Sequence, residues 1–328
     1  MARLLVTGGA GYVGSHALRA LAAAGHEVVV LDDLRAGAAR AVASGVPLVR
    51  GDAGDRELVA RVLAEHGPFT GVLHFAGSIS VPESVADPLL YYRNNTAASA
   101  ALLAAALAHG VRAFVFSSTA AVYGSPARQP IDEDTPLAPE SPYGASKAMV
   151  ERMLADAGRA HGLRWLALRY FNASGADPAG GIGERHDPET HLIPLALEAA
   201  AGLRPSLSLH GADWPTPDGT CVRDYVHVAD LADAHRLGIE TLLGGGASGC
   251  FNLGTGTGRS IREVLAAVER VTGRRVPVAA AARRPGDPAV LVADATRFRG
   301  RFGWTPACSD LDTIVATAWA WLRAWRGL

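Results

Sequence analysis

The chain has 328 residues, of which 49% are hydrophobic and 19% charged, and its formal net charge is −1. A net charge this close to zero excludes the basic surface that binding to nucleic acid or to an anionic membrane requires, so we expect neither partner. Cys221, Cys250 and Cys308 are widely spaced without a C-x-x-C pair, so we expect no disulfide framework and no zinc or other metal site. The sequence contains no evident signal peptide and no apolar run long enough to span a bilayer, which favours a cytoplasmic location.

The N-terminal segment has the pattern of a dinucleotide-binding unit. Residues 3–6 form an apolar strand, residues 12–24 an amphipathic helix, and residues 28–31 a second strand. The turn between the first strand and the helix carries a G-x-x-G-x-x-G spacing, made by Gly8, Gly11 and Gly14. Glycines at this spacing let the backbone approach a pyrophosphate at the positive end of the helix.

Carboxylates after the next strands favour NAD as the dinucleotide. Asp32 ends the second strand, where a carboxylate accepts hydrogen bonds from both hydroxyls of the adenosine ribose and repels a 2′-phosphate. Arg35, three residues further on, weakens this preference for NAD over NADP. Asp52 follows a strand at residues 46–49 and can contact adenine or cap the next helix, and the sequence leaves both roles open.

Further apolar strands at residues 72–77, 113–116 and 165–169 alternate with helical segments. This alternation predicts an α/β fold with a doubly wound parallel sheet, a Rossmann domain that binds ligands at the carboxyl ends of its strands. We expect an NAD-binding domain over residues 1–172 and a smaller α/β substrate domain over 173–328. A segment near residues 225–255 is expected to return to the first domain.

A tyrosine and a lysine lie four residues apart at the start of a predicted helix. Tyr143 and Lys147 therefore project from one face of that helix, and Lys147 is the only lysine in the chain. A lysine supplies a compact charge that arginine cannot replace. Thr119, at the end of a predicted strand, adds a hydroxyl that can share a proton with the tyrosine or simply cap the backbone.

In their order along the chain, these elements resemble the extended short-chain dehydrogenase/reductase superfamily, and within it the family of UDP-glucose 4-epimerases. The resemblance covers nearly the whole length. It is carried by GGAGYVGSH (8–16), HFAG (74–77), YYRNN (91–95), SSTAAVYG (117–124), SPYGASK (141–147), RYFN (169–172), DGTCVRDYVHV (218–228) and RPGD (284–287).

The resemblance implies that Tyr143, Lys147 and Thr119 are catalytic. It implies that NAD is bound by Gly8, Gly11, Tyr12, Val13, Gly14, Asp32, Asp33, Asp52, Ala53, Phe75, Ala76, Gly77, Asn94, Lys147 and Tyr170. It implies that a UDP-hexose is bound by Thr119, Tyr143, Asn172, His191, Leu192, His210, Arg223, Arg284, Asp287 and Leu291.

The implied activity is the interconversion of UDP-glucose and UDP-galactose by transient oxidation at C4, rotation of the 4-keto sugar and return of the hydride, in a homodimer. Tyr143 would act as the base, with its pKa lowered by Lys147 and by the nicotinamide cation. Leu291 is intermediate between the large and small residues of the family, so UDP-N-acetylglucosamine, UDP-glucuronate and UDP-arabinose remain alternative substrates. Ala120 and Ala121 stand where a nucleotide-sugar 4,6-dehydratase needs an acid/base pair, so the sequence offers no evident catalyst for the elimination that such an enzyme performs. A non-catalytic NAD sensor is a further alternative.

Overall fold

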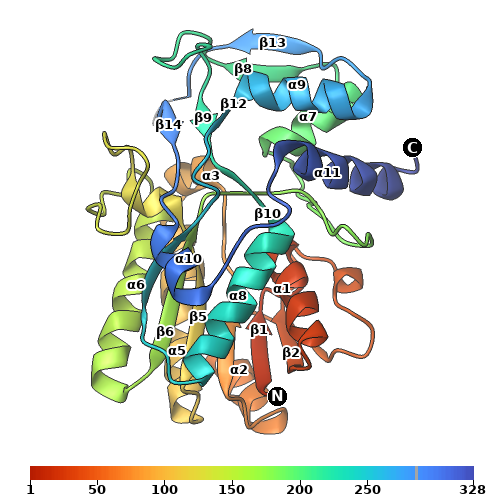
Figure 1. Cartoon of the computed structure of the whole chain (residues 1–328). Helices are drawn as coiled ribbons and strands as arrows, with labels where there is room; N and C mark the ends of the chain where they lie inside the picture. Colours follow the sequence, from red (N-terminus) through yellow and green to blue (C-terminus); the bar gives the residue numbers. More distant parts are fainter. Residues whose placement is uncertain (285–286) are drawn as a thin grey trace.

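The computed structural model describes residues 1–284 and 287–328, so Pro285 and Gly286 of the RPGD motif lie outside the described residues. Within that part of the chain, seven parallel strands form one sheet in the order β11-β6-β5-β4-β1-β2-β3 (Figure 1). The strands are β1 (Arg3–Thr7), β2 (Glu27–Asp32), β3 (Leu48–Arg50), β4 (Gly71–His74), β5 (Ala113–Thr119), β6 (Arg164–Tyr170) and β11 (Gly249–Leu253).

Helices cover both faces of this sheet. They are α1 (Tyr12–Ala23), α2 (Arg56–Glu65), α5 (Ala98–Ala108), α6 (Pro142–His161), α8 (Val228–Leu243) and α10 (Thr296–Phe302), and two short helices, α3 (Val81–Ala86) and α4 (Pro88–Tyr91), pack against α6. Three short helical segments join them: η1 (Ala39–Ala41), the π-helix η2 (Tyr92–Ala97) and η3 (Ala120–Tyr123).

The alternation of side chains along β1 explains the two layers. Leu4 and Val6 point to one face and pack with Leu18 of α1 and Leu231 of α8, whereas Leu5 points to the other face, which α2, α5 and α6 cover. All five side chains are fully buried. Because successive residues of a strand face opposite sides, a strand buried on both faces is continuously apolar, as β1 is.

A second lobe lies above the carboxyl end of the main sheet (Figure 1). It contains α7 (Leu192–Ala200), α9 (Ile261–Thr272), α11 (Leu311–Arg326), β7 (Asn172–Ser174), β8 (Leu207–His210), β9 (Val222–Arg223), β10 (Tyr225–His227), β12 (Arg259–Ser260), β13 (Val278–Ala281) and β14 (Val290–Leu291). Its helices enclose a separate apolar core around Ile193, Val264 and Ile314. The chain leaves the main sheet after β6 and rejoins it with α8 and β11, which pairs with β6 at the sheet edge.

The predicted fold class, a doubly wound parallel sheet with a smaller C-terminal α/β part, is confirmed. One local expectation differs. The strand predicted at residues 72–77 ends at His74, because the amides of Phe75 and Ala76 both turn to donate to the Thr7 carbonyl. The helix before Ala108 begins with the π-helical turn η2. No helix in the described ranges is long and apolar enough to cross a membrane.

Candidate active site

The glycine turn packs so closely that side chains are excluded from it. Gly8 has φ of 73°, and a Cβ there would lie 2.5 Å from the backbone nitrogen of Ala76. A Cβ at Gly14 would lie 2.2 Å from the carbonyl oxygen of Gly8. Helix α1 begins immediately after Gly11, with Tyr12 and Val13 in its first turn, and no side chain of the described residues caps this end. The free amides and the close backbone approach suit the pyrophosphate of a dinucleotide.

Asp32 lies at the carboxyl end of β2, beside this turn. Its Oδ2 accepts a hydrogen bond from the Ala10 amide at 2.9 Å and its Oδ1 one from the Leu34 amide at 2.8 Å. Burial raises the pKa of Asp32, while these two amide bonds work in the opposite direction. Each carboxylate oxygen retains a second lone pair, so the group can still accept hydrogen bonds from ribose hydroxyls.

A cation lies between two carboxylates that follow β2 and β3. Arg35 Nε contacts Asp33 Oδ2 at 2.5 Å, and Arg35 Nη2 lies 3.7 Å from Asp52 Oδ2. Asp52 does not cap α2, because the cap is Asp55, whose Oδ1 accepts from the amides at the start of that helix. The helix-capping role that the sequence left open for Asp52 is therefore excluded. Ala53, next to it, is buried in the core beneath α2 and α5.

Lys147 is only 3% exposed and lies at the centre of the site. Its ammonium donates to the Ser117 carbonyl at 3.1 Å, and the Ser117 hydroxyl is 2.6 Å from the hydroxyl of Tyr170. The same ammonium lies 6.0 Å from the centre of the Tyr143 ring. Burial lowers the pKa of Lys147 to about 8. The Lys147 ammonium is therefore the charged group at which α6, the end of β5 and Tyr170 meet.

The pKa of the Tyr143 phenol lies above its ordinary value when the protein's own groups act alone. Burial raises the pKa of the phenol well above its ordinary value, the neighbouring Tyr170 adds to the rise, and only the hydrogen bond from Thr119 opposes it. The Thr119 hydroxyl also accepts the Ala121 amide at 3.1 Å, so the capping role and the contact with the tyrosine coexist.

The π-helix η2 brings asparagines to the same place. Asn95, which the sequence did not single out, is 2% exposed and binds Ser78 through both amide atoms and Ser146 Oγ at 3.0 Å. The predicted Asn94 donates to Ser78 Oγ at 3.2 Å. A Cβ at Gly77 would lie 2.9 Å from Asn95 Oδ1 and 3.6 Å from the Lys147 ammonium, so this glycine leaves the room between them. π-Helical turns occur frequently at functional sites.

A buried ion pair holds helix α6 in place. Glu151 Oε2 accepts from Arg169 Nη2 at 2.6 Å, Glu151 Oε1 accepts from Arg169 Nε at 2.9 Å, and the Ser118 hydroxyl donates to the same Oε1 at 2.5 Å. Arg169 Nη1 donates to the Tyr123 hydroxyl at 2.8 Å. Glu151 lies one turn after Lys147, so this pair fixes the rotation of α6 relative to β5 and β6.

At the opposite end of the site, β9 and β14 run side by side and bring Arg223 opposite Leu291. Arg223 is largely buried, and its Nη2 lies 3.9 Å from Asp287 Oδ1. Asn172, on β7, is exposed, and its amide donates to the Asp224 carbonyl at 2.9 Å. Leu291 is partly buried against the apolar cluster behind Thr119. The structure therefore gathers these four predicted residues around the strands of the second lobe.

Two other predicted residues lie at the rim of the second lobe. His210 ends β8, and its Nδ1 is 3.1 Å from the Ala282 carbonyl. Arg284 is exposed next to the undescribed residues. Trp214, which was not predicted, donates to the His210 carbonyl at 3.1 Å, and the guanidinium of Arg283 lies 4.3 Å above its ring centre.

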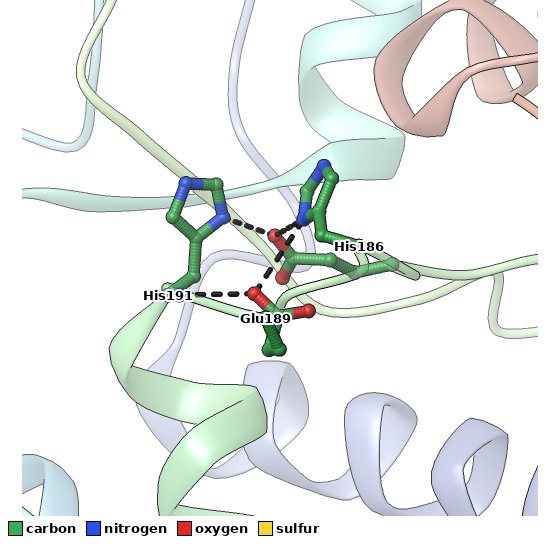
Figure 2. A group of neighbouring side chains, drawn as sticks. His186, Glu189 and His191 are labelled. Carbon is green, nitrogen blue, oxygen red and sulfur yellow. Dashed lines mark hydrogen bonds and ion pairs between the residues drawn. The ribbon is translucent and has the colours of Figure 1, made fainter. Parts of the chain in front are cut away.

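His191 and Leu192 lie at the N-terminal end of α7, where His191 is the N-cap residue without capping the helix through its side chain. His191 Nδ1 instead forms a short contact with the buried carboxylate of Glu184, and His186 lies beside both (Figure 2). Burial opposes ionisation of Glu184, but the two imidazoles lower its pKa to about 2. The carboxylate of Glu184 in turn raises the pKa of His191. Glu184 and His186 were not predicted from the sequence, because only the spacing of cysteines was considered when metal sites were judged.

Comparison with known proteins agrees with this architecture. Residues 4–254 match the model of the NAD dependent epimerase/dehydratase family. A UDP-glucose 4-epimerase from Azospirillum brasilense is 56% identical to this chain over 98% of it and 92% of the relative.

Solved structures agree as well. The UDP-glucose 4-epimerase from Brucella ovis in complex with NAD superposes with a TM-score of 0.94 at 48% identity, covering 98% of both chains. A UDP-glucose-4-epimerase from Stenotrophomonas maltophila with bound NAD and formylated UDP-arabinopyranose superposes with a TM-score of 0.95 at 41% identity, covering 100% of this chain and 99% of the other. The resemblance seen in the sequence motifs is confirmed, and the chain belongs to the NAD-dependent epimerase/dehydratase family.

Proposed function

We propose that the protein is an NAD-dependent UDP-glucose 4-epimerase, an isomerase of nucleotide sugars. The observation that carries the proposal is the arrangement of Tyr143, Lys147 and Thr119 at the carboxyl end of the parallel sheet, opposite the glycine turn. The relatives named above support it, because 56% identity over nearly the full chain includes every element that contributes to the site.

The residues present fit NAD as the resident cofactor. The glycine turn offers uncapped amides for the pyrophosphate, and Asp32 offers a carboxylate for the adenosine ribose. Lys147 and Tyr170, joined through Ser117, would hold the nicotinamide ribose. Bound NAD⁺ supplies an acceptor for the C4 hydride and later gives the hydride back.

Tyr143 would carry the proton of the reaction. It removes the proton from the sugar's 4-hydroxyl as C4 is oxidised and returns it when C4 is reduced, so it acts as base and then as acid. The protein's own groups raise the pKa of the phenol. Positive charge beside the phenol, from Lys147 and from the nicotinamide of bound NAD⁺, would stabilise the phenolate. Thr119 would hydrogen-bond the same 4-oxygen.

The second lobe would hold the nucleotide diphosphate. Arg223 provides a largely buried guanidinium that can bind phosphate through two hydrogen bonds, and the uncapped start of α7 at Leu192 provides amides with a favourable dipole. Inversion requires the 4-keto hexose to turn over and present its other face. The strong contacts must therefore be to UDP, and the contacts to the hexose must be weak.

A panel of UDP-sugars tests the proposal. The purified protein is incubated with UDP-glucose, UDP-galactose, UDP-N-acetylglucosamine, UDP-glucuronate and UDP-arabinose, and the configuration at C4 is followed by NMR. We expect UDP-glucose and UDP-galactose to interconvert without added NAD, because the cofactor is regenerated in each cycle and need not leave. Activity of a cofactor-free preparation would overturn the scheme, and no conversion of any sugar would favour the NAD sensor.

The choice of sugar depends on Leu291, which is partly buried and intermediate in size. We propose that it admits hexoses and disfavours an N-acetyl group. A Leu291→Ala variant should gain turnover of UDP-N-acetylglucosamine relative to UDP-glucose if this side chain limits the pocket.

We further propose a cytoplasmic homodimer. Its interface would involve α5 and α6, where Met149 is 44% exposed, and Leu89 on the neighbouring α4 is 73% exposed. Cys221, Cys250 and Cys308 are unpaired, as a reducing compartment requires. Sedimentation equilibrium of the wild-type protein and of a Met149→Glu variant would test the dimer, since the added charge should weaken a pairing through α6.

A further inference from the structure

A compact group of two glutamates and two histidines lies in the loop between β7 and α7, and one of its members, His191, also belongs to the predicted UDP-hexose-binding set. Its members are Glu184, His186, Glu189 and His191, and one potential ligand atom from each lies within 4.8 Å of all the others. We propose that this group binds one divalent transition-metal ion and that Zn²⁺ suits it best.

Two of the distances between ligand atoms suit a four-coordinate ion. Zinc bonds to imidazole nitrogen and carboxylate oxygen of about 2.0–2.2 Å give ligand atoms roughly 3.4 Å apart in a tetrahedron. His186 Nδ1 lies 3.3 Å from Glu184 Oε1 and 3.5 Å from Glu189 Oε1. His191 Nδ1 contacts the same Glu184 oxygen more closely than two ligands of one ion can lie, so ion binding would have to move these two side chains apart. Figure 2 shows the imidazoles of His186 and His191 and the carboxylate of Glu189 turned toward a common centre.

A second observation points to a ligand. His186 Nδ1 is buried and has no hydrogen-bond partner among the described residues, although it faces two carboxylates. Its ring is held edge-on against Tyr12, with centres 6.4 Å apart, and against His191, with centres 5.0 Å apart. The nitrogen thus faces both carboxylates at ion-pair distance without a well-formed hydrogen bond to either.

The donor set suits zinc in charge as well as in geometry. Two carboxylates and two neutral imidazoles balance one divalent cation, so the occupied site carries no net charge. Without an ion, protons on the imidazoles supply the balancing charge, and metal binding would displace them. Coordination through Nδ1 would leave His191 Nε2 directed away from the ion.

Surrounding contacts orient the ligands. Glu189 Oε1 accepts the amides of Thr190 at 2.8 Å and His191 at 2.9 Å, and Trp321 Nε1 donates to the Glu184 carbonyl at 2.8 Å. Contacts of this kind fix the direction of metal ligands. Glu184, His186 and Glu189 line a small open hollow together with Trp321 and Trp325 of α11, which gives an ion access.

The inference does not depend on the proposed epimerase activity, because metal binding is measured without a sugar. The NAD-bound protein is dialysed against a chelator, freed of the chelator, and titrated with Zn²⁺ by calorimetry. It is also titrated with Co²⁺, whose visible absorption reports tetrahedral coordination. We expect one equivalent to saturate the site and Co²⁺ to develop the intense tetrahedral spectrum.

Variants locate the ion. Glu184→Gln and His186→Gln should each weaken binding at least about tenfold. Glu189→Gln provides a ligand variant that keeps an acceptor for the two loop amides and so preserves the fold. His109→Gln and Glu65→Gln, both at exposed surface positions, serve as matched controls and should bind as tightly as wild type. Retained NAD and an unchanged circular dichroism spectrum verify folding.

Two results would overturn the proposal. Absence of saturable binding would mean that the four side chains form only a proton-balanced ion network. Saturable binding that the ligand variants leave unchanged, or that the control variants weaken equally, would place the ion elsewhere on the protein.

Discussion

Removal of Glu151 should destabilise the protein far more than removal of any surface charge on the same helix. In a Glu151→Met variant, Arg169 loses two hydrogen bonds and its counter-ion while its side chain stays 5% exposed. Leaving one partner of a buried ion pair uncompensated costs about 3–5 kcal/mol. Because a folded domain has only about 5–15 kcal/mol of total stability, this is a large fraction of it.

Urea unfolding followed by circular dichroism measures the loss. Asp156→Asn is the matched control, since Asp156 pairs with Arg152 on the exposed face of the same helix, and such a pair contributes at most about 1 kcal/mol. The Glu151→Met/Arg169→Met double variant should be no less stable than Glu151→Met alone, because the stranded guanidinium is gone. A loss below about 1 kcal/mol for Glu151→Met would refute the reasoning.

The same variant should slow the reaction. Helix α6 carries Tyr143 and Lys147, and the ion pair sets its rotation against the sheet. A displacement of about 1 Å at a reacting group lowers a rate by roughly 10²-fold. The double variant should recover stability without recovering the rate, because α6 still lacks the bond from Ser118 to Glu151.

The remaining predictions concern single groups. Tyr143→Phe removes the hydroxyl that moves the proton and should keep NAD while lowering the epimerisation rate by about 10²–10⁴-fold in the NMR assay; an unchanged rate would show that another group is the base. Gly14→Ala puts a Cβ 2.2 Å from the backbone oxygen of Gly8 and should lower the NAD retained on purification, whereas Gly300→Ala, which has open space around it, should not. Burial lowers the pKa of His235 to about 4, below its ordinary value. The stability that the neutral imidazole contributes is therefore complete above about pH 6.5. It decreases by up to about 1.4 kcal/mol per pH unit as the pH falls toward 4. His235→Gln should reduce the slope of stability against pH between 7 and 5 in urea titrations, and identical slopes for the two proteins would count against a buried neutral histidine.

The fold was predictable because its signals are local. The glycine spacing, the apolar strands and the Tyr143–Lys147 spacing each depend on residues close together in sequence, and a parallel sheet brings the ends of such strands to one edge. The placement of Thr119 beside Tyr143 follows from the same rule.

What the sequence did not reveal depends on contacts between distant segments. Glu151 meets Arg169 only because α6 packs on β6, and Asn95 faces Ser146 only because a π-helical turn rotates it inward. The direction of the Lys147 ammonium, toward Ser117 rather than toward Tyr143, follows from burial of its stem between α6 and β5. Spacing along a helix specifies the face on which a side chain lies but not the atom it binds.

The burial of Lys147 allows local unfolding of the active-site helix α6 to be measured by proteolysis. A protease specific for lysine has one peptide bond to cut in this chain, the bond between Lys147 and Ala148, and in the native state it lies within α6 with its recognition side chain covered. Cleavage into fragments 1–147 and 148–328 therefore requires α6 itself to unfold. Fraying of the termini or of surface loops does not expose the bond that the protease cuts. The rate of that single cut, with and without a nucleotide sugar, measures the free energy with which the ligand holds the active-site helix closed.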